Sequence, residues 1–499
     1  MSEQILVPFE GDGSGAGELS WGQRNIWIPI RRHHTSLPIG RARKLAAGVT
    51  IGDVAAQLGL LLSRHQALRT RVEFDPAVDR DARQVLSSSG EIPVEIVDSA
   101  IAGHDPARAA EAVRRRYRET EFDYPKEWPL RCAVITHQGA PSYLVPVFCH
   151  LSIDGFGIAA MLMDLLARGQ DQIGMAALLA ARSTVPGRGT LGTPPLEQAR
   201  WQASPDGQRV SDRALRHWER LMSSVPARRV VDGADPREPR HWIATSQSRA
   251  ACLAAQAIAG RLQLRTAPVL FAAYAVAFAR AIGSNPVLVQ IALSNRLRPG
   301  LAGTVSAVAQ MGLATIDVAD ATFDQVVRDA WRATMTASRY SYYDPYGQQA
   351  LIDAMTERRG EQMEVRCFFN DHRAQIGPEV IGPPPAPDEL AAALSLTTLD
   401  WEEPTDQSNE PFFVSVGNAE NVPDTIVWSV NFDTNYLSPG RVEAFLHEME
   451  SILVSAAFDP ACAVSNLVHR RWPAALCALG GSCGVIPGRY SRWCRSGSS

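Results

Sequence analysis

The sequence alternates between segments with helical and with strand-like periodicity, and it does so twice, on either side of a polar stretch. In the first half, Thr50 precedes an apolar helical face, and residues 130–148 form two strand-like runs around a turn at 138–141. The second half repeats the pattern. Its expected helices and strands are, in chain order, 250–281, 287–293, 322–331, 364–370, 412–416, 426–432 and 438–453. This alternation predicts an α/β (α+β) fold in which helices pack against sheets.

The boundary between the two halves is expected in the stretch 181–239. Residues 181–207 are rich in Gly, Pro, Ser and Thr and predict a surface connection, and a second polar stretch covers 226–239. A helix around 212–222 lies between them. The predicted organisation is an N-terminal lobe at 1–205, a linker with a connecting helix at 206–239, a C-terminal lobe at 240–465 and a flexible basic tail at 466–499.

Composition and charge exclude several classes of function. The chain has 499 residues, with 49 Lys and Arg against 53 Asp and Glu, so it lacks the basic excess of a general nucleic-acid binder. The first residues lack a basic and apolar signal segment, and no apolar run reaches the about 18 residues that span a bilayer. The eight cysteines have no CxxC spacing, which favours reduced thiols in the cytoplasm and no metal site. We therefore expect a cytoplasmic protein without nucleic-acid or membrane partners.

The most informative motif runs from Val147 to Gly157, with the sequence VFCHLSIDGFG. A strand-like run ends at His150, a short turn follows, and helical spacing begins at Gly155. An imidazole with an ordinary pKa of about 6.5 can accept a proton from an attacking group near neutral pH. We expect Asp154 to hold the turn by pairing with a buried arginine. We expect Gly155, which has no side chain, to keep space open beside the histidine. Alternatively, His150 is a core histidine with a purely structural role, beside an Asp–Gly turn.

This motif resembles the HHxxxDG signature of the condensation domains of non-ribosomal peptide synthetases, within the chloramphenicol-acetyltransferase-like acyltransferases. Other segments resemble further motifs of that family, in the family's order. They are LSWGQRNIW at 19–27, RHQALRT at 64–70, ALRHWERL at 214–221, SNR at 294–296 followed by 304–313, and VNFDTNYL at 430–437. The resemblance covers about residues 15–460.

The resemblance implies two chloramphenicol-acetyltransferase-like lobes that meet in a V around a central substrate tunnel. It also implies that a segment near residues 425–432 crosses over and latches the first lobe. The site residues carried over from the family are His150, Asp154 and Gly155 as the catalytic group, Arg296 and Cys149 as structural support of the site, and Trp21, Arg69 and Gln310 along the tunnel. In this scheme Asp154 is a structural partner of Arg296, and Gly155 with the amides that follow assists the oxyanion.

Two departures from the family pattern affect the expected chemistry. Cys149 stands where the family has its first histidine, while His150 keeps the place of the histidine that the family ties to catalysis. A small apolar thiol can replace a packing residue, and a nucleophilic role for Cys149 would need a lowered thiol pKa. The segment 303–311 also differs from the family's GxFVNTL motif, so we expect an unusual donor or acceptor specificity.

The implied activity is that of a free-standing condensation enzyme. An acyl or peptidyl group would pass from the phosphopantetheine thioester of a carrier protein to a small-molecule amine or hydroxyl acceptor, and the enzyme itself would bind no cofactor. Three interpretations stay open: this carrier-dependent acyltransferase, a non-catalytic condensation-like platform that recruits carrier proteins or tailoring enzymes, and an acyltransferase that uses acyl-CoA.

Overall fold

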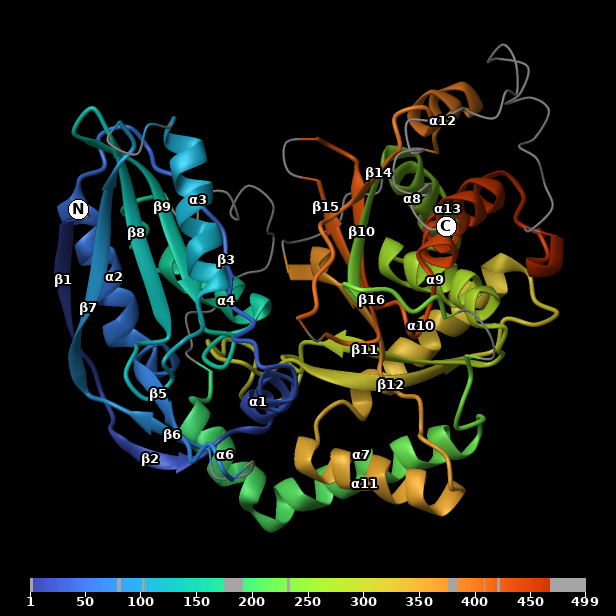
Figure 1. Ribbon diagram of the computed structural model, residues 1–499, viewed down its shortest axis with the longest axis horizontal. Coiled ribbons are helices and arrows are strands. Elements are labelled where there is room, and N and C mark those ends of the chain that lie inside the picture. Colours follow the sequence, from blue (N-terminus) through green and yellow to red (C-terminus); the bar gives the residue numbers. More distant parts are fainter. Residues whose placement is uncertain are drawn as a thin grey trace.

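The computed structural model describes residues 3–466, apart from gaps at 79–81, 101–102, 104, 175–191, 231–233, 376–383, 408 and 420–421. Two large sheets stand on opposite sides of the molecule, and helix α1 (Trp21–His33) lies between them (Figure 1). We call the six-stranded sheet with its helices the first lobe, and the seven-stranded sheet with its helices the second lobe. The mixed helices and sheets confirm the predicted α+β class.

The first lobe is built on a mixed sheet of order β1-β7-β8-β9-β3, in which β4 also pairs with β9. Its strands are β1 (Glu3–Glu10), β7 (Ser89–Asp98), β8 (Leu130–His137), β9 (Ala140–Phe148), β3 (Ile39–Gly40) and β4 (Arg43–Lys44). A small sheet beside it contains β2 (Gly15–Glu18), β6 (Arg83–Leu86) and β5 (Thr70–Glu73). Helices α2 (Ile51–Arg64) and α4 (Gly155–Ala167) fill one face of the large sheet, and α3 (Pro106–Glu119) covers the other.

The predicted hairpin at 130–148 is confirmed as β8 and β9. Pro146 lies inside β9, where a residue without an N–H group weakens a ladder on one side. On the side away from β8, β9 pairs with β3 at 147–148 and with β4 at 143–144, so Pro146 falls in the gap between these short partners. The proline therefore lies opposite the break between β3 and β4, where its missing N–H group disrupts no strand pairing.

The second lobe contains a seven-stranded sheet of order β12-β11-β13-β15-β16-β10-β14, in which β11, β13 and β15 run parallel. The strands are β10 (His241–Ser248), β11 (Val287–Leu293), β12 (Gln310–Ile316), β13 (Cys367–Asp371), β14 (Thr398–Trp401), β15 (Phe412–Asn418) and β16 (Ile426–Asp433). The strand β16 pairs with β10 and β15. The strand β16 therefore belongs to the second sheet. It does not form the expected latch by pairing with a strand of the first lobe.

The core of the second lobe is formed by helices that cover one face of this sheet. They are α8 (Arg249–Leu262), α9 (Thr266–Ile282), α10 (Phe323–Arg339), α12 (Pro387–Leu394) and α13 (Pro439–Phe458). The expected long apolar segment 250–281 is the pair α8 and α9, which is bent by 113°. Within the described residues, no single helix is long and apolar enough to cross a membrane; this bent pair meets such a test by length and composition alone.

The connection between the lobes is more ordered than its composition predicts. Part of the expected surface connection forms helix α6 (Pro195–Ala203), and the expected connecting helix is longer than predicted, as α7 (Pro205–Ser223). Buried Gln202 accepts a hydrogen bond from the backbone N–H of Trp21 at 2.8 Å, and Gln198 donates to Oγ of Ser306 at 3.1 Å. Tertiary hydrogen bonds thus override the Gly- and Pro-rich composition. Helix α11 (Pro345–Arg359) packs beside α7 along one end of the molecule (Figure 1).

Helix α1 links the two lobes, although its sequence was not predicted to be helical. Ser20 and Gln23 form a capping box at its start. Arg24 donates to Asp344 at 3.0 Å, and His33 contacts Glu410 at 3.3 Å, so charged groups of the second lobe hold both ends. All but the first residue of the expected basic tail at 466–499 lies outside the described residues.

Candidate active site

The motif at 147–157 forms a strand, a turn and a helix, as its periodicity predicts. Strand β9 ends at Phe148 and α4 begins at Gly155, with Asp154 as the N-cap. In the turn, Nδ1 of His150 lies 3.0 Å from the backbone oxygen of Ile153. Since a carbonyl oxygen only accepts hydrogen bonds, Nδ1 carries the proton and Nε2 keeps its lone pair. The fold therefore presents His150 with Nε2 as a proton acceptor.

The surroundings of His150 keep this imidazole neutral. Burial lowers its pKa from the ordinary 6.5, while the nearby carboxylate of Asp154 acts in the opposite direction. The residue is only partly buried, so a part of its surface stays accessible. A neutral, accessible imidazole with an unprotonated Nε2 can serve as a general base at neutral pH.

The carboxylate of Asp154 is fully occupied by protein donors. One oxygen accepts from the N–H of Gly157 at 2.6 Å, which caps the first turn of α4, and forms an ion pair with Nη2 of Arg296 at 2.9 Å. The other accepts from Nη1 of Arg296 at 3.1 Å and from the N–H groups of Val308 and Ala309, both at 2.8 Å. Burial alone would raise the pKa of Asp154, but Arg296 and the two amides outweigh it and hold the pKa below its ordinary value. Asp154 thus joins the two lobes directly beside His150.

Arg296 anchors the segment that leaves β11. Its guanidinium binds Asp154 and also donates to the backbone oxygens of Thr304 and Ser306, both at 2.9 Å. The expected Asp154–Arg296 pair is therefore present, within a wider network. A Cβ atom on Gly157 would lie 2.8 Å from the oxygen of Ser306, so only glycine allows this close approach. The motif predicted Gly155 as a site residue but not Gly157. The position of Gly157, two residues later in the same motif, could have indicated that it also belongs to the site.

Cys149 packs behind the motif in the core of the first lobe. It is 3% exposed and lies in an apolar cluster with Trp27, Phe122 and Leu151. Burial raises the pKa of its thiol to about 12, so the thiol stays protonated at neutral pH. The adjacent cavity measures about 10 Å³, which is too small for a substrate. These properties fit structural support and oppose a nucleophilic role.

The three residues expected along the tunnel are each about 1% exposed and have partners within the protein. Trp21 packs against Tyr342 with ring centroids 4.9 Å apart. Arg69 donates to the backbone oxygens of Gly13, Ser87 and Asp12. The amide of Gln310 donates to the backbone oxygen of Tyr343 at 2.8 Å. These surroundings favour a packing role for the three side chains, and their contact with a substrate stays a prediction.

The second lobe also brings a histidine to this region that sequence reasoning missed. His372 begins the short 3₁₀ helix η2 (His372–Gln375), which follows β13 and packs against α4. Burial lowers the pKa of His372, and His150 is among the groups that lower it further. No pattern in the sequence predicts that His372 lies in this region, because its place depends on how the two lobes pack.

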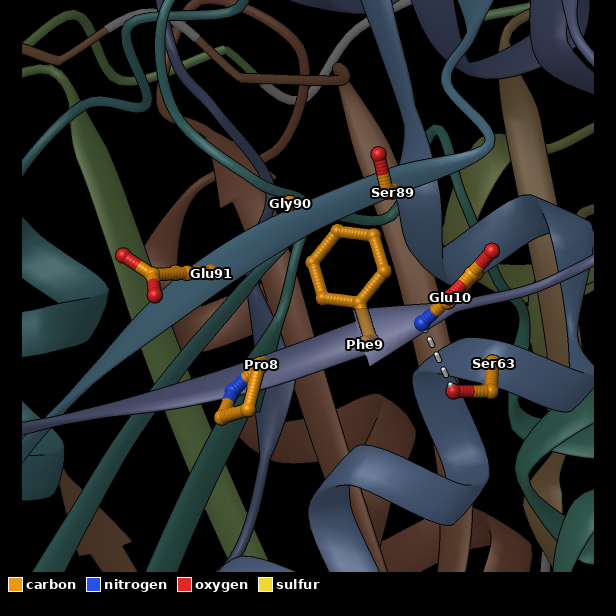
Figure 2. A pocket seen from close by; sticks show the side chains of 7 residues that line it. All are labelled: Pro8, Phe9, Glu10, Ser63, Ser89, Gly90 and Glu91. Atoms are coloured by element: carbon orange, nitrogen blue, oxygen red, sulfur yellow. Dashed lines mark hydrogen bonds between the residues drawn. The ribbon is translucent and has the colours of Figure 1, made fainter.

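Three hollows of the surface lie away from these residues. The one in Figure 2 has a volume of about 480 Å³ and is bordered by β1, β7 and the end of α2. Figure 2 shows Phe9 and the carboxylates of Glu10 and Glu91 around it. None of the predicted site residues lines this hollow. In the described part of the chain, no group of three or more His, Cys, Asp or Glu side chains is placed to hold a metal ion.

Two relatives of this chain are a synthase and a synthetase that are much longer than it, and each matches it over only a part of its length. The chain is 22% identical over 474 residues to the isonitrile lipopeptide synthase of Mycobacterium tuberculosis, covering 90% of this chain and 18% of that protein. It is 28% identical over 313 residues to the antimetabolite synthetase AmbB of Pseudomonas aeruginosa, covering 59% of this chain and 23% of that protein. The chain therefore spans less than a quarter of the length of either relative.

Solved structures of low sequence identity share the fold. The condensation domain that mediates chain release from the enacyloxin polyketide synthase is 20% identical, with a TM-score of 0.64 over 89% of this chain and 83% of that chain. SgcC5 from Streptomyces globisporus is 16% identical, with a TM-score of 0.64 over 90% of this chain and 100% of that chain. The X-domain of teicoplanin biosynthesis, solved in complex with OxyB, is 16% identical, with a TM-score of 0.63 over 92% and 97% of the two chains.

The family model named Condensation domain matches residues 42–469, which is most of the chain and includes the whole motif around His150. Together with the two-lobed α+β fold, this match shows that the chain belongs to the condensation domain family.

Proposed function

We propose that the protein transfers an acyl or peptidyl group from a carrier-protein thioester to an amine or hydroxyl acceptor in natural-product biosynthesis. The observation that carries the proposal is the hydrogen bond from Nδ1 of His150 to Ile153, which leaves Nε2 unprotonated and able to act as a base. Membership of the condensation domain family and similarity to segments of peptide synthetases support it. The thioester would be held on the phosphopantetheine arm of the carrier, and both substrates would meet in a tunnel between the lobes.

The proposed reaction needs no covalent intermediate on the enzyme. The acceptor nitrogen or oxygen forms a bond to the thioester carbonyl carbon, and its proton passes to Nε2 of His150. The carbon–sulfur bond then breaks, and the thiolate takes the proton back from the imidazolium. Most of the rate enhancement would come from holding the two substrates together. We assign Gly155, at the first position of α4, to the oxyanion, because leading N–H groups of a helix lack intrahelical partners.

A second candidate is a condensation-like platform that recruits other proteins. Two observations favour it: Cys149 replaces the first histidine of the family signature, and the X-domain in complex with OxyB has a similar fold. A third candidate, transfer from acyl-CoA, uses the same base and differs only in the donor.

The donor class can be tested by intact-protein mass spectrometry. We expect the protein to release the acyl group from a loaded carrier protein in the presence of an amine or hydroxyl acceptor, and to leave acyl-CoA unchanged. A matched sample without acceptor controls for hydrolysis. Consumption of acyl-CoA with an intact acyl carrier would favour the third candidate. Binding of the carrier without any loss of acyl mass would favour the platform.

The pH dependence of transfer should report the neutral state of His150. Because burial places the pKa of His150 below 6.5, the base stays unprotonated at neutral pH and is lost only as the pH falls through that lowered pKa. With a hydroxyl acceptor, we expect kcat/KM to be flat near pH 7 and to fall on the acid side below pH 6.5. With an amine acceptor, protonation of the amine near a pKa of about 8 should move the acid limb upward. An acid limb above 6.5 with the hydroxyl acceptor would contradict the assignment.

A further inference from the structure

The parallel strands in the centre of the second sheet bring two turns to the same edge. Strands β11 and β13 pair in parallel and end at Leu293 and Asp371. The chain that leaves β11 carries Arg296, which binds the carboxylate beside His150. The chain that leaves β13 carries His372. Residues just beyond the carboxyl ends of neighbouring parallel strands lie close together, and ligands of open α/β sheets bind at such edges.

The backbone around His372 is fixed by its neighbours. Arg373 donates to both carboxylate oxygens of Asp371, at 2.9 and 2.6 Å, in a two-pronged ion pair. It also donates to Oγ1 of Thr266, the first residue of α9, at 2.9 Å. This network ties the turn to a core helix, while η2 packs against α4 of the first lobe. The turn that carries His372 is therefore held by elements of both lobes.

Besides burial, three charged or titratable groups act on the pKa of His372: Asp371, Arg41 and His150. Burial lowers the pKa of His372, Asp371 acts against this, and Arg41 and His150 lower it further. At neutral pH, His372 thus has one nitrogen that donates a hydrogen bond and one that accepts. Arg41 lies between the short strands β3 and β4, so two of these groups, Arg41 and His150, come from the first lobe.

We propose that His372 is a further catalytic residue, which holds the nucleophilic atom of the acyl acceptor by a hydrogen bond while Nε2 of His150 takes its proton. The inference rests on the proposed function, because it requires an acceptor that attacks a thioester. His372 neither gains nor loses a proton overall: the acceptor proton passes to His150 and then to the departing thiolate. A neutral imidazole suits this role for an amine or a hydroxyl group, since each can both donate and accept.

The shared location of the two histidines can be tested without turnover. In histidine-labelled protein, an NMR titration should show that His150→Gln raises the pKa of His372, because His150 lowers it in the unmodified protein. The signal of His447, whose side chain is 59% exposed on α13, is the internal control. A titration curve of His372 that does not change in the His150→Gln variant would overturn the proposal.

Kinetics test the role itself. We expect His372→Ala to lower kcat/KM for the acceptor by about tenfold or more, the effect of one lost hydrogen bond to a reacting group, with little change in KM for the acyl carrier. His372→Asn keeps a hydrogen-bonding amide and should recover part of the loss. His447→Ala, at an exposed position of the same lobe, is the matched control and should keep full activity.

The outcomes separate this inference from the proposed function. If the unmodified protein transfers the acyl group and His372→Ala does so equally well, the role of His372 is overturned and the proposed function stands. If the unmodified protein transfers nothing from a loaded carrier to any acceptor, the proposed function fails and the role of His372 fails with it. Equal thermal melting of the variants excludes misfolding as the cause of a loss.

Discussion

Replacement of His150 by alanine is expected to reduce turnover by about a hundredfold or more, within the range for loss of a general base. The reason is specific to the geometry: the bond from Nδ1 to Ile153 fixes the tautomer, so Nε2 alone can take the acceptor proton. Folding should be retained, because the imidazole is only partly buried and this one hydrogen bond lies in a turn. The measurement is the single-turnover rate of acyl transfer, with circular dichroism and thermal melting as checks on the fold.

The neighbouring residue provides the control for this substitution. Cys149→Ala removes a thiol that stays protonated at neutral pH, so the variant should transfer the acyl group at nearly the normal rate. Turnover of His150→Ala within a few-fold of normal would remove His150 from the mechanism. Loss of turnover in Cys149→Ala, in a protein that melts normally, would instead revive the nucleophilic role of the cysteine.

Replacement of Asp154 by alanine should destabilise the protein as well as inactivate it. The carboxylate is 3% exposed and binds Arg296 together with three backbone N–H groups, so its removal strands a buried guanidinium and leaves amides unpaired. Loss of one partner of such a pair costs on the order of 3–5 kcal/mol of unfolding free energy. Arg296→Ala should cost a similar amount, and the double variant less than the sum. Chemical denaturation of the four proteins measures these differences.

The two possible roles of Asp154 predict different results. If it positions the turn, Asp154→Ala loses stability and activity together, and Asp154→Asn, which keeps the size and one acceptor oxygen, is less affected. Because its pKa is lowered in the folded protein, its stabilising contribution is present at neutral pH and is lost as the pH falls through and below the ordinary value of 3.8. An Asp154→Ala variant that melts normally and has no turnover would show that Asp154 takes part directly in catalysis.

Local periodicity was sufficient to predict much of the fold. The hairpin at 130–148 and the strand at 287–293 were predicted correctly, because continuous apolar runs between turn residues have few alternatives. The helix expected after Thr50 is α2, which ends at Arg64 and is followed by a 3₁₀ turn, η1 (Gln66–Arg69). Helix α1 was missed because it contains Pro29 and several charged residues, and it is stabilised by contacts with the second lobe.

The candidate site could be predicted only where a motif marked it. The capping role of Asp154 follows from its place before a helix, and its pairing with Arg296, 142 residues away, was expected from a family resemblance. The amides of Val308 and Ala309 and the imidazole of His372 reach the same region only through packing of the two lobes. No local pattern encodes such contacts, since each joins segments that lie far apart in the sequence.

The most direct test of the proposed acyl transfer is a single-turnover experiment with a carrier protein that bears an isotopically labelled acyl thioester. Equal amounts of loaded carrier, acceptor and protein are mixed, and intact-mass spectrometry follows the carrier while the acceptor is analysed for the label. We predict that the label leaves the carrier and appears on the acceptor through a new amide or ester bond, and that His150→Ala slows this transfer by about a hundredfold or more. A carrier that keeps its label with every amine and hydroxyl acceptor tested, or equal transfer by the His150→Ala variant, would contradict acyl transfer with His150 as the general base.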